Sequence, residues 1–114
     1  MLLNGGELDG VQILKTETVA LMTKDHLGPL GNRSDQEYFP GPFAGFGLGV
    51  AVINKPIMFI QPGTFYWIGW AGTLFGVNPN KKLIRILMFQ NPDETDKIYM
   101  WRPFGNYVEK SVSD

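Results

Sequence analysis

The sequence predicts an α+β fold in which an antiparallel sheet of three to four strands carries a helix and a C-terminal helical segment. Apolar residues recur at helical spacing in residues 16–27, and extended segments rich in glycine and aromatic residues fill residues 45–90. A second stretch with an apolar side follows at residues 97–112. Helices and strands that occupy separate parts of a chain are typical of α+β folds. The 114 residues suit a single domain, 1–114.

Composition excludes several classes of function. Hydrophobic residues make up 44% of the chain, which is enough for a core, and the net charge is −1 with scattered basic residues. Binding to nucleic acid needs a clustered basic face, so no nucleic-acid partner is predicted. Cysteine is absent, which removes disulfides and thiolate metal sites. The sequence shows no signal peptide and no apolar run near the ~20 residues of a membrane span, so no membrane partner is predicted and the compartment stays unknown.

The N-terminal third contains turn and helix signals. Gly5 is expected as a left-handed cap on the tail of a helix, which is either the end of a longer helix or a short frayed start. The Asp9-Gly10 pair predicts a turn. Residues 16–27 form the clearest helix, and Glu17 favours its first turn through the helix dipole.

A loop over residues 28–44 is predicted from its glycines and prolines, and strands follow it. The predicted strands are residues 45–53, 64–70 and 83–90, and residues 72–77 form either a further strand or the continuation of the one at residues 64–70. The strand at residues 83–90 is the strongest, because only Arg85 interrupts its apolar residues. A strand that is apolar on both faces is normally covered on both.

The C-terminal quarter leaves two interpretations open. Residues 91–96 read as an acidic loop, in which Asp93, Glu94 and Asp96 lack the spacing of a calcium loop. Residues 97–112 form either one closing helix or a helix broken after Pro103. No metal site and no cofactor are predicted.

Four pieces of the chain together resemble one known family. They are the "loop, hairpin, then helix" passage of residues 3–22, the glycine-rich segment at residues 45–49, the segment at residues 63–73 and the strands of residues 75–90. Their order and spacing resemble the serine β-lactamase-like family, which includes class C β-lactamases, penicillin-binding DD-peptidases and related esterases. The resemblance covers roughly residues 2–90 and implies a partial β-lactamase/transpeptidase-like fold.

The resemblance also implies where a binding site would lie. The family's third active-site motif, Lys-Thr-Gly or a His/Trp-x-Gly variant, has a counterpart in Trp67-Ile68-Gly69. By position, the backbone N–H of Trp70 is then the oxyanion donor of that strand. Trp70 stands where the family has a small residue and can crowd the cleft, and Tyr66 replaces a usual glycine. The aromatic residues here either form a stacking platform or pack in the core.

The other two motifs of the family are missing. None of the serines, Ser34, Ser111 and Ser113, has a lysine three residues on, and no tyrosine or serine has an asparagine two residues on. The family places both motifs upstream of the passage with which this chain starts. The resemblance therefore implies the C-terminal portion of a hydrolase, and no catalytic residue is predicted. His26, the single histidine, has no evident catalytic partner.

Three functional hypotheses follow. The first is a truncated relative of a serine β-lactamase-like hydrolase that is not catalytic alone. The second is a binding module for small molecules or glycans that uses the aromatic cleft. The third is one half of a split hydrolase. Because the family pairs N-terminal strands with the strand at residues 83–90, that strand is an expected exposed edge. A homo-oligomer, formed through this edge or by exchange of the C-terminal segment, is therefore predicted.

Overall fold

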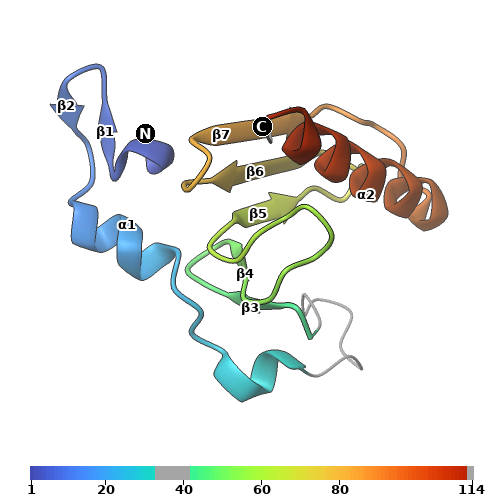
Figure 1. The fold of residues 1–114 in the computed structure, drawn as a ribbon, viewed down its shortest axis with the longest axis horizontal. Helices are drawn as coiled ribbons and strands as arrows, with labels where there is room; N and C mark the ends of the chain where they lie inside the picture. The colour runs from blue at the N-terminus through green and yellow to red at the C-terminus, as the bar shows by residue number, and fades with distance from the viewer. Residues whose placement is uncertain (33–41, 113–114) are drawn as a thin grey trace.

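The computed structural model describes residues 1–32 and 42–112, and Figure 1 shows their arrangement. Part of the predicted loop at residues 28–44, with Ser34, lies outside the described residues, as does Ser113. The elements in chain order are η1 (Leu2–Asn4), β1 (Glu7–Leu8), β2 (Val11–Gln12), α1 (Thr16–Met22), η2 (Gly28–Asn32), β3 (Ala44–Phe46), β4 (Ala51–Ile53), β5 (Phe65–Ile68), β6 (Leu74–Asn78), β7 (Leu83–Leu87) and α2 (Glu94–Ser111).

The N-terminal turn signals form the predicted structures. Gly5 closes η1 in the left-handed conformation, with φ 63°, and its N–H donates to the carbonyl of Leu2. Asp9 and Gly10 both have positive φ, as a two-residue hairpin turn of type I′ requires, and they join β1 to β2. The cap and the hairpin are therefore confirmed.

Helix α1 is shorter than the predicted span of residues 16–27, because the chain turns away after Met22. The carbonyl of Met22 accepts from the N–H of Leu48, and the N–H of His26 donates to the carbonyl of Phe46. These bonds join the end of α1 to the β3–β4 hairpin. Val19 is the buried residue of α1, and Figure 1 shows the helix outside the main sheet rather than on its face.

The main sheet has five antiparallel strands in the order β3-β4-β5-β6-β7. The fold class is as predicted, with one strand more than expected. The extra strand arises because residues 45–53 do not form one strand, as was predicted, but fold back on themselves. Gly49 takes a positive φ of 86°, and the N–H of Gly47 donates to the carbonyl of Val50 across the turn. The alternating glycines therefore make a hairpin.

The two faces of the sheet are covered differently. One face carries the core cluster of Val50, Val52, Phe65 and Val77, with η1 packed at its end. Helix α2 covers the other face (Figure 1).

Strand β7 lies at one end of the sheet, so its predicted edge position is confirmed. Its predicted coverage on both faces is wrong. Ile84 and Ile86 are more than half exposed, whereas Arg85 between them is 5% exposed. Arg85 points toward α2, where its guanidinium group pairs with the buried carboxylate of Glu109. The predicted homo-oligomer stays a prediction.

Helix α2 runs without a break through Pro103. Its N-cap is Asp93, whose carboxylate accepts from the N–H groups of Thr95 and Asp96, so the second half of the predicted acidic loop is the first turn of this helix. The helix is attached near its first half by a 2.7 Å hydrogen bond from Trp101 Nε1 to the carbonyl of Gly72. Among the described helices, none is long and apolar enough to cross a bilayer.

Candidate functional site

The counterpart of the third motif lies at the end of β5. Trp67 and Ile68 belong to the strand, whereas Gly69 and Trp70 belong to the turn that leads to β6. The N–H of Gly69 donates to the carbonyl of Thr73 at 2.7 Å, which closes this turn. The predicted strand at residues 64–70 is therefore too long at its end, and the backbone of Trp70 lies in a hairpin turn.

Gly69 and Gly72 are both needed by this turn. A Cβ atom at Gly69 would lie 2.2 Å from Thr73 Oγ1, so a side chain there would displace the threonine. Gly72 has a φ of 99°, which side chains rarely allow. The turn thus presents a Gly-x-x-Gly backbone with Trp70 at its tip.

Strand alternation separates the predicted cleft residues. Trp67 lies on the face opposite α2, where it lines an open apolar hollow of about 330 Å³ together with Phe75 and Ile86. Tyr66 and Ile68 line the space under α2. Tyr66 is therefore not on the same face as Trp67, because successive side chains of a strand point to opposite faces.

The aromatic residues of β5 and of the turn after it lie in different environments. Phe65 is 2% exposed and belongs to the core, as the packing interpretation predicts. Trp67 makes an edge-to-face contact with Phe46, with ring centroids 4.9 Å apart. Trp70 is 80% exposed. The four aromatic residues at positions 65, 66, 67 and 70 therefore do not share one environment, and of these four it is Trp67 that lines the open hollow.

Other polar residues that the sequence offered have structural partners. A ring nitrogen of His26 lies 2.8 Å from the carbonyl of Leu21, at the end of α1. Ser111 is in the last turn of α2, and its hydroxyl donates to the carbonyl of Val108 at 2.8 Å. Thr64 is fully buried, and its hydroxyl has no hydrogen-bond partner among the described residues. Among residues 1–32 and 42–112, no group of three acidic or histidine side chains could hold a metal ion.

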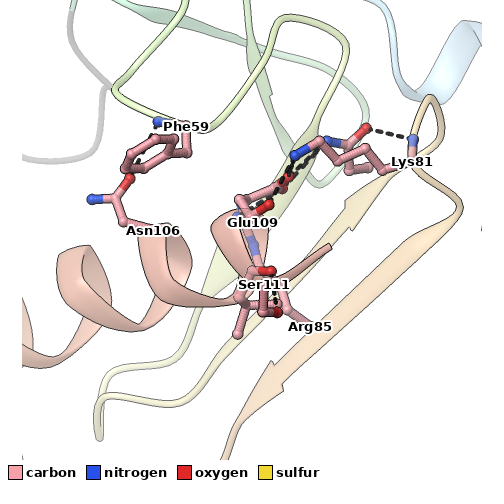
Figure 2. Close-up of polar contacts among 8 residues, drawn as sticks. Phe59, Lys81, Arg85, Asn106, Glu109 and Ser111 are labelled. Carbon is pink, nitrogen blue, oxygen red and sulfur yellow. Dashed lines mark hydrogen bonds and ion pairs between the residues drawn. The ribbon is translucent and has the colours of Figure 1, made fainter. Parts of the chain in front are cut away.

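A buried charged cluster was missed from the sequence. Glu109 of α2 is completely buried, and Figure 2 shows the polar contacts that converge on it. Its carboxylate lies 3.1 Å from Arg85 Nη1 and 3.2 Å from Lys81 Nζ, and it accepts from Asn78 Nδ2 at 3.1 Å. Lys81 Nζ also donates to the carbonyl of Glu109 at 2.9 Å. The cluster attaches the second half of α2 to the turn between β6 and β7.

The environment of Arg85 depends on a glycine and a tyrosine. A Cβ atom at Gly76 would lie 2.5 Å from Arg85 Nε, so the arginine can cross β6 only because residue 76 has no side chain. Burial lowers the pKa of Arg85, and the charges of Glu109 and Tyr66 partly oppose this effect. Burial raises the pKa of Tyr66, and the Arg85 charge partly opposes it. The only signal in the sequence was the lone arginine in an apolar strand.

Comparison with known proteins supports the expected fold. No family model matches the chain. Protein Rv1367c of Mycobacterium tuberculosis (strain ATCC 25618 / H37Rv) is 36% identical over an alignment of 103 residues, which covers 82% of this chain and 25% of that protein. The uncharacterized protein MT1414 of strain CDC 1551 / Oshkosh gives the same values. The chain thus spans about a quarter of the length of the curated relatives it matches.

A solved structure is similar over almost the whole chain. It is that of unliganded simvastatin synthase (LovD) from Aspergillus terreus, with a TM-score of 0.70 and 19% sequence identity. The match covers 96% of this chain and 31% of that chain. At this identity the likeness concerns the fold. The chain has a serine β-lactamase-like fold in part, as the sequence predicted.

Proposed function

We propose that this chain supplies one wall of a serine β-lactamase-like acyl-transfer site and does not hydrolyse acyl substrates alone. One observation carries the proposal: the segment that resembles the family's third motif ends in a tight turn beside an open hollow, whereas the sequence has no Ser-x-x-Lys. The serine within the described residues, Ser111, lies on α2 with its hydroxyl bonded to the helix backbone. An activated nucleophile needs a base within hydrogen-bond reach.

The chemical role that we propose for the segment at residues 67–70 is electrostatic stabilisation of a developing oxyanion. The resemblance assigns the backbone N–H of Trp70 as an oxyanion donor, and a donor aimed at a developing alkoxide is worth about 3–4 kcal/mol. The nucleophile and its base would come from polypeptide beyond these 114 residues, in the same protein or in a partner chain, as in a split hydrolase. The similar proteins are three to four times as long, which supports a complement of this kind.

The first test uses the chain alone. We expect no turnover of nitrocefin or of p-nitrophenyl butyrate above background, and no adduct in intact-protein mass spectra after treatment with a fluorophosphonate or penicillin. An adduct on Ser34, Ser111 or Ser113, or turnover that a serine-directed reagent abolishes, would contradict the proposal.

The second test adds a complementing chain that carries Ser-x-x-Lys and Tyr-x-Asn. We expect turnover to appear, to persist in Trp70→Ala and to fall about 100-fold or more in Trp70→Pro. Both substitutions remove the indole, but only proline removes the backbone N–H. Equal activity of the two variants, with equal circular dichroism spectra, would refute the assigned role of this amide.

A second candidate function is binding of a glycan or small aromatic molecule beside β5. The specific observation is that Trp70 is 80% exposed in the turn that follows Trp67 and its apolar hollow. Large exposed aromatic residues offer stacking surfaces. Such a ligand should quench tryptophan fluorescence in the wild type and in Trp101→Phe but bind more weakly to Trp70→Ala. Equal binding to all three proteins would exclude this site.

A further inference from the structure

A second hollow lies on the opposite face of the sheet, between α2 and strands β4 to β7. Its volume is about 510 Å³, within the range of small-molecule sites. Most of its lining is aliphatic or aromatic, including Ile53, Ile68, Leu74 and Trp101. Most of its lining differs from that of the hollow beside Trp67, although Ile68 and Leu74, at the ends of β5 and β6, line both.

The polar groups that line this second hollow are mainly hydrogen-bond donors. Arg85, Arg102 and Tyr66 line it, and so does Asn106, whose amide both donates and accepts. Among the lining residues that the structure describes, none is acidic. Glu109 compensates the charge of Arg85 from outside the lining, whereas Arg85 Nε has no hydrogen-bond partner among the described residues. Because burial raises the pKa of Tyr66, its hydroxyl keeps its proton at neutral pH. The lining therefore complements a negatively charged or acceptor group.

One rim of the hollow is a short loop that α2 holds in place. The backbones of Ile57 and Ile60 exchange hydrogen bonds of 3.0 and 2.9 Å. Asn106 of α2 accepts from the N–H of Phe59 at 3.4 Å (Figure 2). Its amide nitrogen also donates to Met58 Sδ at 3.0 Å.

Met58 itself is unusual in this loop. Its backbone has a positive φ of 53°, which costs free energy in a residue other than glycine. Its side chain is exposed. Strained residues of this kind gather at ligand sites, and methionine adapts its shape to apolar ligands.

We propose that the hollow under α2 binds an anionic amphiphile, a medium-chain carboxylate. The alkyl chain of this ligand lies among the apolar residues around Leu74 and Trp101, where removal of its methylene groups from water favours binding. The carboxylate lies toward Arg102 and the hydroxyl of Tyr66. The proposal does not depend on the acyl-transfer role of β5, because it uses neither the nucleophile nor the turn at Trp70.

Calorimetric titration with decanoate, below its micelle concentration, tests the proposal. We expect saturable binding of decanoate, at least tenfold weaker binding of decyltrimethylammonium, and an approximately tenfold loss of decanoate affinity in Arg102→Gln. A tenfold loss corresponds to about 1.4 kcal/mol, close to the lower end of the range for hydrogen bonds to charged groups. Arg102 is exposed on α2, so its substitution should not unfold the chain.

Two controls keep the proposal falsifiable. Lys110→Gln removes a positive charge from the last turn of the same helix and should leave decanoate affinity unchanged. Trp70→Ala should also leave it unchanged, because Trp70 does not line this hollow. The proposal is overturned if decanoate does not bind, if the ammonium analogue binds equally well, if Arg102→Gln has no effect, or if Trp70→Ala abolishes binding.

Discussion

Removal of the Glu109 carboxylate should destabilise the fold more than loss of any surface ion pair. In Glu109→Ala, the side chain of Arg85 keeps its charge at 4% exposure without its carboxylate partner. Breaking a buried pair in this way costs about 3–5 kcal/mol. Lys81, whose side chain is 23% exposed, can turn toward solvent and contributes little of this cost. Domains of this size are stable by about 5–15 kcal/mol, so the loss is a large fraction of the whole.

Urea unfolding followed by circular dichroism measures this change directly. The double variant Arg85→Met with Glu109→Leu should recover most of the lost stability, because replacing both partners by apolar residues leaves no buried charge. Glu17→Ala removes an exposed acid from α1 and should change the free energy of unfolding by less than about 0.5 kcal/mol. The reasoning fails if Glu109→Ala costs less than about 1 kcal/mol, or if the double variant is no more stable than the single one.

Three further predictions concern other contacts. Gly76→Ala should lower the free energy of unfolding in urea by about 1–3 kcal/mol, because its Cβ would lie 2.5 Å from Arg85 Nε; an unchanged midpoint would show that the arginine moves freely. Trp101→Phe should cost about 1 kcal/mol by losing the bond to the carbonyl of Gly72, and hydrogen exchange should then accelerate first in the early turns of α2; uniform acceleration over the chain would contradict this. Burial raises the pKa of Asp25, but four hydrogen bonds to its carboxylate outweigh this and lower the pKa overall. Asp25→Asn should therefore melt below the wild type at pH 7. The gap in melting temperature should narrow as pH falls below about 4, where the carboxyl of the unfolded chain takes up its proton, and close as pH passes the lowered pKa of the folded protein; a gap of equal size at pH 3 would refute this.

The features that could be predicted from the sequence depend on short-range chemistry. The cap at Gly5 and the hairpin at Asp9 and Gly10 require positive φ, which glycine and aspartate permit locally. The strands from β5 to β7 were predicted because tight turns separate apolar runs. The resemblance supplied their order and the edge position of β7.

The features that were missed depend on partners far along the chain. Arg85 is buried because Glu109, 24 residues later, meets it, and nothing in the strand itself indicates this. The turn inside residues 45–53 was missed because glycines alternate there with apolar residues, and this alternation is equally typical of a single strand. Of the candidate site, the sequence located the segment that includes Trp67. It did not indicate that Tyr66 would lie under α2 with a second hollow, because the face of each residue depends on the register of the whole sheet.

The position of Pro103 has a consequence for how α2 can move. The helix is fastened at Trp101 and again at Glu109, and Pro103, which lacks an N–H group, lies between the two fastenings. A bend at Pro103 breaks neither the contact of Trp101 nor that of Glu109, because proline already leaves the helix without one backbone hydrogen bond at this point. The middle of α2 can thus move away from the sheet at the cost of the contacts of Asn106 with Met58 and Phe59, and the hollow beneath it can widen for a larger ligand while both attachments hold.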